Sequence, residues 1–330
     1  MMTKNLEVLL GWKKIIGDKK VDFIIGGPPC QAYSVAGRIR DSEKMKNDYR
    51  NYLFEYYLKV VKSLNPKLFV FENVPGMLTA MPGGVKILDL IKEGFESIGF
   101  ELIDDVKKYA VVNSSEYGVP QNRRRVILVG LNKKYFKKDR QKILEEFYTN
   151  IFPKYKEEGK TVEEVLQDMP KIYPHSEDSH PSHYLSDEKV NYTWHIPRYH
   201  SLRDIKIFQM LAKDIETGQN LYTDSNVLRD IYNEVTGGST KVHKYHVLRK
   251  NEVSTTILAH LHKDGLRFIH YDPKQARSIT VREAARLQSF DDDFDFIGTM
   301  GSAYKMIGNA VPPKLAKKIA LALNDLMEKN

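Results

Sequence analysis

The most constraining feature of the sequence is an alternation of short apolar runs with amphipathic segments in its first hundred residues. Residues 21–25 form an apolar run closed by Gly26-Gly27-Pro28-Pro29, which predicts a buried strand ending in a rigid loop. Apolar side chains at spacings of three and four predict a helix over 53–64, followed by a strand at 68–71. A second helical stripe spans 85–98. This order predicts an α/β domain with a mainly parallel sheet, whose ligands bind beyond the carboxyl ends of its strands.

The rest of the chain continues with strand, helix and turn signals. A Thr280-x-x-Glu283 pair has the spacing of a capping box, and Pro312-Pro313 is typical of a helix start. The expected elements are strands at 100–112 and 124–131, a charged, solvated helical insertion at 133–168, and helices at 202–215, 284–289 and from 313 onward.

Length and composition divide the chain into two parts. A chain of 330 residues is long enough for about two domains of ordinary size. All ten histidines lie between His175 and His270, and the net charge of +8 is distributed as +7 over 1–174, zero over 175–270 and +1 over 271–330. We therefore expect 175–270 to be a separate domain. The basic balance favours a polyanionic partner.

Several classes of protein are excluded. One cysteine cannot form an internal disulfide, and no signal-peptide pattern follows Met1, so we expect the reducing cytosol. No apolar run approaches the roughly 20 residues of a membrane-spanning helix, so no membrane partner is expected. No HExxH or Cys-His zinc spacing occurs, and no metal site is expected.

Three positions carry side chains suited to chemistry. Cys30 lies just past a predicted strand end, in a Gly-Pro bracket that a buried core cysteine would not need. Glu72 ends the strand at 68–71, where partial burial favours the protonated carboxyl; the alternative is a carboxylate that caps the next turn. Arg123 to Arg125 are either a solvated charge run or, by strand alternation, one pair that faces a common site.

Five motifs occur in the order and approximate spacing found in the DNA cytosine C5-methyltransferases, which the chain resembles over nearly its whole length. They are Gly27-Pro28-Pro29-Cys30-Gln31, Glu72-Asn73-Val74, Gln121-x-Arg123-x-Arg125, the segment from Arg277 to Gln288, and Gly308-Asn309-Ala310-Val311-Pro312. The resemblance implies a Rossmann-like class I core that uses S-adenosylmethionine, with a smaller target-recognition domain. It places the discontinuous catalytic domain at 1–174 plus 271–330 and the target-recognition domain at 175–270.

The resemblance also implies roles for individual residues. Cys30 matches the nucleophile that adds to C6 of a flipped-out cytosine, and Glu72 matches the acid at N3. Arg123 and Arg125 match residues that hold the cytosine O2 and orient the acid and the backbone. The expected contacts to the methyl donor are Pro29, Leu53, Asn309, Ala310 and Val311. The expected contacts to double-stranded DNA are Gln31, Ser34, Arg198, His200, Arg203, Lys241 and Lys244, the clustered histidines being surface or base-facing residues rather than metal ligands.

The chain departs from the family pattern at its start. Members begin with a strand and a Phe-x-Gly-x-Gly turn, whereas here 29 residues precede Cys30 and no such turn occurs. The expectation is a chain that lacks the first half of its donor site, either because a partner chain supplies it or because the gene is truncated.

Two further functions stay open at this stage. One is an inactive or partner-dependent DNA-binding subunit of a split methyltransferase, and the other is an RNA cytosine C5-methyltransferase. A bacterial restriction-modification role would place the protein on DNA in the cytoplasm, with a cognate restriction endonuclease as a second partner.

Overall fold

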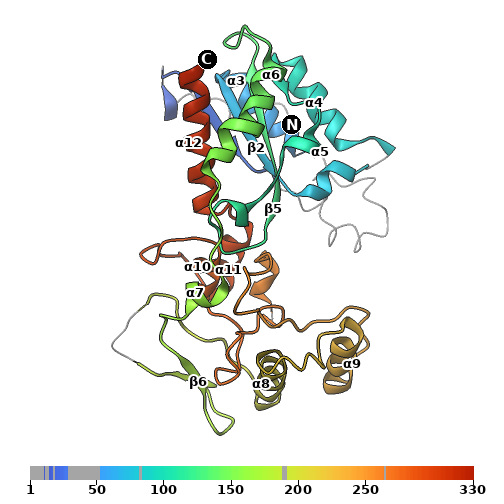
Figure 1. The fold of residues 1–330 in the computed structure, drawn as a ribbon, viewed down its shortest axis with the longest axis vertical. Helices are drawn as coiled ribbons and strands as arrows, with labels where there is room; N and C mark the ends of the chain where they lie inside the picture. Colours follow the sequence, from blue (N-terminus) through green and yellow to red (C-terminus); the bar gives the residue numbers. More distant parts are fainter. Residues whose placement is uncertain are drawn as a thin grey trace. The chain divides into compact units, whose positions relative to one another are not determined.

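Two compact units make up the computed structural model, which is drawn in Figure 1. The described residues are 11, 15–17, 19–28, 53–81, 84–187, 192–263 and 265–330. The first unit comprises 1–113, 124–155 and 320–330, and the second comprises 114–123 and 156–319. The second unit contains all of 175–270 but also flanking segments on both sides, so its limits differ from those of the domain expected from the sequence. No helix among the described residues is long and apolar enough to cross a membrane.

The first unit is built on one sheet in the order β1-β2-β5-β3, with β4 also paired to β5. Its strands are β1 (Phe23–Gly26), β2 (Leu68–Asn73), β3 (Phe100–Leu102), β4 (Val111–Asn113) and β5 (Arg124–Asn132). Only β1 and β2 run parallel among the described strands, with Phe23 opposite Leu68, whereas β2, β3 and β4 are all antiparallel to β5. The expectation of a mainly parallel sheet is therefore wrong for this part. The segment between β4 and β5 is too short for the crossover that parallel pairing requires.

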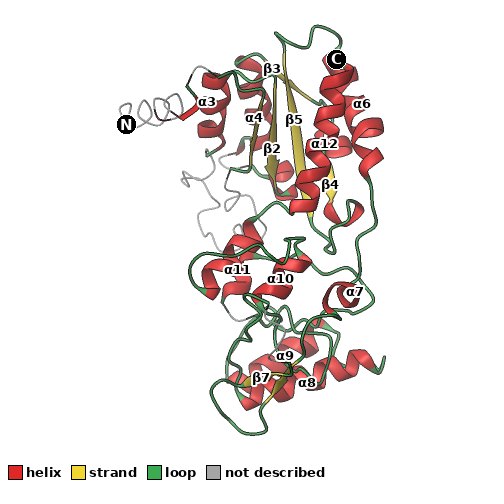
Figure 2. Cartoon of the chain, turned by 90° about the vertical axis from the view of Figure 1, so that its left-hand side faces the viewer, coloured by secondary structure: helices red, strands yellow, loops and turns green. Residues whose placement is uncertain are grey.

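Helices cover both faces of this sheet, as Figure 2 shows. On one face lie α3 (Phe54–Leu64) and α4 (Ile87–Ser97), and on the other α6 (Arg140–Glu146) and the C-terminal part of α12 (Pro313–Lys329). Aromatic side chains fill the first interface, where the Phe69 and Phe95 rings stack 4.2 Å apart and Tyr57 meets Phe71 edge-on at 5.5 Å. Such pairs stabilise a core beyond their area burial. The predicted helices at 53–64 and 85–98 and the predicted strand at 68–71 are confirmed.

Two expected elements differ from the structure. The segment 100–112 is not one strand, because α5 (Val106–Tyr109) separates β3 from β4. Asp105 starts this helical turn by accepting a hydrogen bond from the Lys108 backbone N–H at 2.9 Å, which favours a helix over a continued strand. The segment 133–168 is not a solvated insertion either, since its apolar side chains Leu144, Phe147, Ile151, Phe152, Val162 and Leu166 are buried.

The second unit combines short helices with one small hairpin. Its elements are α7 (Val162–Leu166), β6 (Ile172–Pro174), β7 (His183–Leu185), α8 (Leu202–Glu216), α9 (Ser225–Thr236), the 3₁₀ turn η7 (Ala259–His262), α10 (Val281–Leu287) and α11 (Met300–Asn309). One apolar core gathers around α10 and α11, and another around α8. The predicted capping box of Thr280 and Glu283 is confirmed, as is the helix start at Pro313.

Candidate active site

An ion pair joins the ends of two neighbouring strands in the first unit. Glu72 lies near the carboxyl end of β2, and Arg125 lies near the start of β5, which runs antiparallel to β2. The Arg125 Nε is 2.9 Å from Glu72 Oε1, and the two side chains are only 12% and 16% exposed. Limited exposure weakens solvent screening of the pair and fixes the direction of the carboxylate. Arg125 also donates to the Arg124 carbonyl at 2.7 Å, which holds its guanidinium in place.

The backbone that follows β1 lies directly against this carboxylate. A Cβ built on Gly27 would be 2.8 Å from Glu72 Oε2, which is closer than real Cβ contacts allow. The Asn73 side-chain amide donates to the Pro28 carbonyl at 3.4 Å, while its oxygen accepts from the Val74 backbone N–H at 2.8 Å. The parallel pairing of β1 with β2 brings these ends to one edge of the sheet. The chain that leads to Cys30 therefore passes within contact distance of Glu72.

The hydroxyl of Tyr57, on α3, contacts both β1 and β2. Its hydroxyl donates to the Val70 carbonyl at 2.8 Å and lies 3.2 Å from the Ile24 carbonyl. Burial raises the pKa of Tyr57 well above its ordinary value, so the hydroxyl stays a donor at physiological pH. A Cβ on Gly26 would lie 2.5 Å from the Tyr57 ring, so glycine is required for this close approach. Sequence reasoning missed Tyr57, because its place in the apolar helical stripe gave no sign of a polar contact.

Several expected site residues lie outside the described part of the chain. These are Cys30 and Pro29 together with two of the expected DNA contacts, Gln31 and Ser34. Leu53 is described and stands half-buried immediately before α3. Its backbone is helical and its position is fixed by the start of that helix.

Arg123 belongs to the second unit, and its contacts differ from those of Arg125. It is 1% exposed, and its guanidinium donates to the carbonyls of Ile257 at 3.0 Å, Gly308 at 2.9 Å and Ala310 at 3.1 Å. These partners are all backbone atoms, so Arg123 ties the loop after α11 to the segment at 257. These contacts agree with the expected role of orienting the backbone, and a common site for Arg123 and Arg125 stays a prediction.

The segment Asn309–Val311 begins at the last residue of α11 in the second unit. Asn309 is exposed, whereas Ala310 and Val311 are half-buried. The backbone is extended at Ala310, whose carbonyl accepts a hydrogen bond from Arg123. An exposed amide beside small and branched apolar side chains suits a ligand that carries both polar groups and an aromatic base.

The expected DNA contacts fall into two groups. Arg203 and Lys241 are exposed, and Lys244 is half-buried with its ammonium 6.0 Å from the centre of the Tyr232 ring. Arg198 instead donates to the carbonyl of Leu261 at 2.8 Å and to those of the next two residues, which holds η7. His200 is 4% exposed and its Nε2 lies 3.1 Å from the Ser278 hydroxyl, so it is an interior residue.

The expectation that the clustered histidines are surface residues is wrong for four of them. His183, His195, His200 and His270 are all at most 5% exposed. Burial lowers the pKa of His183 to about 4 and those of His200 and His270 to about 3, so the rings are neutral at physiological pH. Hydrogen bonds to neighbouring polar groups compensate their burial.

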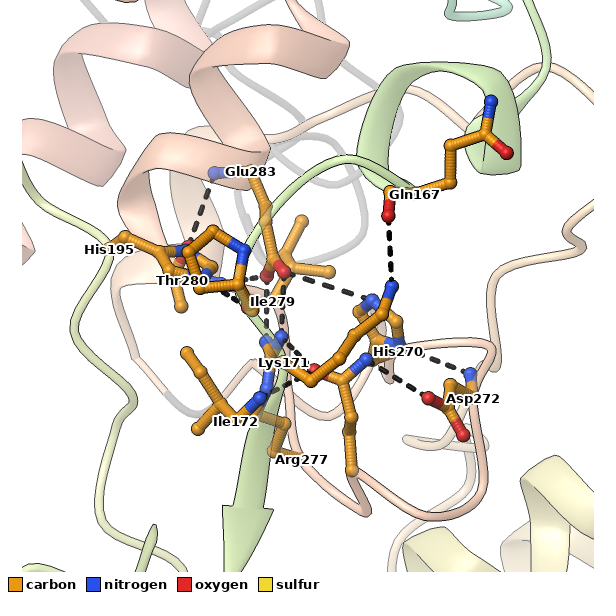
Figure 3. A network of polar contacts seen from close by, with 12 residues as sticks. Gln167, Lys171, Ile172, His195, His270, Asp272, Arg277, Ile279, Thr280 and Glu283 are labelled. Atoms are coloured by element: carbon orange, nitrogen blue, oxygen red, sulfur yellow. Dashed lines mark hydrogen bonds and ion pairs between the residues drawn. The ribbon is translucent and has the colours of Figure 1, made fainter. Parts of the chain in front are cut away.

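Two of these histidines, His195 and His270, lie beside a buried ion pair, as Figure 3 shows. Arg277 donates two hydrogen bonds to Glu283, at 2.7 and 2.6 Å, and both residues are at most 1% exposed. Arg277 holds the pKa of Glu283 well below its ordinary value although burial acts in the opposite direction. Glu283 also accepts from the Thr280 backbone N–H at 2.7 Å, and His195 lies 3.0 Å from the Thr280 hydroxyl. The motif from Arg277 to Gln288 is thus a folding element of the second unit.

No group of three or more His, Cys, Asp or Glu side chains suited to a metal ion is found in the part of the chain that the structure describes. The described residues bring together a carboxyl and a guanidinium, those of Glu72 and Arg125, next to the segment that leads to Cys30.

Comparisons with known proteins point to one family of enzymes. The family model for C-5 cytosine-specific DNA methylase matches residues 4–325. The Type II methyltransferase M.Bpa9945I of Bacillus paralicheniformis is 36% identical over 93% of this chain and 71% of that protein. M1.HphI of Haemophilus parahaemolyticus, also a Type II methyltransferase, is 33% identical over 93% of this chain and 69% of its own length.

One solved structure is also similar to this chain in its three-dimensional fold. A protein described as a DNA modification methyltransferase encoded within a prophage (E. coli) superposes with a TM-score of 0.58 at 26% identity, covering 98% of this chain and 83% of that one. The α/β fold is that of the class I methyltransferases. The chain belongs to the family of C-5 cytosine-specific DNA methylases and is a DNA cytosine-5-methyltransferase.

Proposed function

We propose that the chain methylates C5 of a flipped-out cytosine in duplex DNA through a covalent bond between Cys30 and C6. The observation that carries this proposal is the Arg125–Glu72 pair, 2.9 Å apart and largely buried, against the backbone that leads to Cys30. A base must leave the stack for an enzyme to reach both faces of its ring, at a cost of a few kcal/mol.

The proposed steps use three side chains. The Cys30 thiolate adds to C6, and Glu72 as a carboxylic acid donates to N3, which accepts the electron density that enters the ring. Arg125 orients the Glu72 carboxyl and holds the cytosine O2. Once C5 carries the methyl group, water takes the C5 proton, the C5–C6 double bond re-forms as the Cys30 thiolate leaves C6, and N3 returns its proton to Glu72. Arg123 contributes indirectly, because its guanidinium donates to backbone carbonyls and orients that backbone.

S-adenosylmethionine supplies the methyl group when it is bound. We assign its contacts to Pro29, Leu53 and Asn309–Val311. Within the second unit, the half-buried apolar side chains of Ala310 and Val311 and the exposed amide of Asn309 support contacts to the adenosine and to polar groups of such a ligand. No metal is needed for the proposed chemistry.

We assign recognition of the DNA sequence to 175–270, and catalysis to 1–174 together with 271–330. Arg203 and Lys241 are exposed cations in the recognition segment and Lys244 is a half-buried one. Gln31 and Ser34 follow Cys30 in the sequence. Arg198 contributes by holding η7, and the buried His200 is not included. The Type II relatives support a place in bacterial restriction-modification, on DNA in the cytoplasm, with a cognate endonuclease as partner.

The test is transfer of a radiolabelled methyl group from S-adenosylmethionine to unmethylated duplex DNA. We expect Cys30→Ala to abolish transfer, and Glu72→Gln to lower the rate at least about 100-fold, because general acid catalysis contributes about 10²- to 10⁴-fold. Glu101→Gln is the matched control, since Glu101 forms a partly exposed pair with Arg140 at 2.6 Å in the same unit. We expect this control to keep its activity.

A second readout follows the covalent step. DNA that contains 5-fluorocytosine should trap the wild-type chain as an adduct, because the fluorine cannot leave as a proton does. An adduct that persists in Cys30→Ala would overturn the assignment of the nucleophile. Methylation of transfer RNA in place of duplex DNA would overturn the assignment of the substrate.

A further inference from the structure

Two buried glutamines form a polar network in the second unit that neither the proposed reaction nor the ion pair of Figure 3 uses. Gln121 and Gln288 are both 0% exposed. The Gln121 amide N–H groups donate to the Gln288 side-chain oxygen and to the Leu287 carbonyl, and its own oxygen accepts from the Ile257 backbone N–H at 2.8 Å. Each amide is therefore fixed in one orientation.

The remaining hydrogen bonds of this network join Gln288 to the end of α11. Its amide nitrogen donates to the Ile307 carbonyl and to the Ala310 carbonyl, both at 2.9 Å. Carbonyls in the last turn of a helix lack intrahelical donors, so a buried helix end needs such partners. Arg123 supplies the other donors, to Gly308 and again to Ala310.

The same region allows a very close backbone approach. A Cβ on Gly308 would lie 2.1 Å from the Ala259 nitrogen and 2.4 Å from the Leu258 carbonyl carbon, so η7 packs directly on the end of α11. The segment 257–259 is thus bonded to Gln121 and Arg123 and pressed against Gly308. The backbone leading into Asn309–Val311 is fixed from two sides.

We propose that Gln288 is a positioning residue that holds the Asn309–Val311 loop in the conformation that binds the methyl donor. The inference rests on the proposed function for the role of that loop, and on the contacts of Gln288 for the way it is held. Gln288 itself does not touch the donor. Its loss should therefore weaken donor binding while it leaves the acid, the nucleophile and the DNA contacts in place.

The experiment compares Gln288→Met with a matched control, Gln275→Met. Gln275 is also buried in the second unit, where it accepts from the Ile172 backbone N–H at 3.1 Å and from Arg277 at 2.7 Å. We expect Gln288→Met to raise the dissociation constant and the KM for S-adenosylmethionine about tenfold, because one net hydrogen bond corresponds to about that factor. The kcat and the KM for DNA should change less than about threefold in the same variant.

Hydrogen exchange tests the loop without reference to activity. Backbone amides of 306–312 should exchange faster in Gln288→Met than in wild type and should be unchanged in Gln275→Met. Gln288→Glu keeps the shape of the side chain and the acceptor for Gln121 but loses at least one of the two N–H donors. We expect it also to raise the donor KM and to speed exchange in 306–312, so it provides a second test if Gln288→Met folds poorly.

The outcomes separate the inference from the proposed function. Unchanged exchange in 306–312 for both Gln288 variants, or equal donor KM in the Gln288 and Gln275 variants, overturns the positioning role. A wild-type chain that neither binds nor uses S-adenosylmethionine overturns the assignment of the donor site, while the exchange measurement still decides whether Gln288 holds the loop.

Discussion

At the scale of single residues, Gly27 is the position where one added carbon should have the largest effect on the reaction. Its Cβ would lie 2.8 Å from Glu72 Oε2, so Gly27→Ala must displace either the carboxyl or the backbone that leads to Cys30. A displacement of about 1 Å at a reacting group can lower a rate about 100-fold. We expect a fall in kcat of that order, measured by methyl transfer under saturating DNA and donor.

The control for this substitution is Gly301→Ala in α11. A Cβ there would meet no atom closer than the Thr299 hydroxyl at 3.8 Å, which is ordinary van der Waals contact. Alanine is favoured over glycine inside a helix, so this variant should keep its activity and its stability. Equal activity in the two variants would show that the Gly27 contact does not position Glu72.

The residues that carry the proposed chemistry were predictable from the sequence only in part. Glu72 and Arg125 stand at strand ends in the predicted sheet, and the structure pairs them. The resemblance implied that Arg123 orients backbone, but its particular partners, the carbonyls at 257, 308 and 310, were not predictable. A pattern of residue types contains no information about which distant carbonyls lack donors.

At the scale of elements, two helices of the second unit begin with the same capping box in different surroundings. Glu283 of α10 is buried and paired with Arg277, whereas Glu164 of α7 is solvent-exposed and reaches only Thr161. Glu283→Gln leaves Arg277 as a buried charge without its counter-ion. We expect the free energy of unfolding to fall by about 3–5 kcal/mol, measured by chemical denaturation.

Glu164→Gln provides the comparison for that helix start. The side chain is in water, so the substitution should lower stability much less than Glu283→Gln does. Replacement of the pair by apolar residues, Arg277→Met with Glu283→Leu, should recover part of the loss because no unpaired charge is left. Equal losses for Glu164→Gln and Glu283→Gln would show that only the capping bonds matter.

The helix starts were predictable because their signals are local, as at Thr280 and Pro313. The segment 100–112 was not, because its apolar residues suit a strand as well as a short helix. Only the Asp105 bond to Lys108 and the pairing of β3 and β4 with different parts of β5 decide the outcome. Both facts depend on contacts that the local pattern does not contain.

At the scale of the whole molecule, the division into compact units cuts the Gln121-x-Arg123-x-Arg125 motif. Arg123 belongs to the second unit and Arg125 to the first. Composition predicts a change near 175, where the histidines begin. The second compact unit also includes 114–123, 156–174 and 271–319, which contain no histidine. Four histidines with buried rings form part of its polar core.

These buried histidines predict how stability depends on pH. Burial lowers the pKa of His200 and His270 to about 3 and that of His183 to about 4, from an ordinary value of 6.5, and partial burial lowers the pKa of a fifth histidine, His246, to about 4 as well. Between pH 6.5 and about 4 the unfolded chain therefore binds protons that the folded chain does not, so stability falls as pH falls. Each histidine contributes about 1.4 kcal/mol per pH unit at most. The free energy of unfolding, measured with urea, should be much lower at pH 5.5 than at pH 7.5. This difference between the two pH values should be smaller in His200→Gln than in wild type. A free energy of unfolding that is equal at the two pH values would mean that these rings are solvated or already charged in the folded chain.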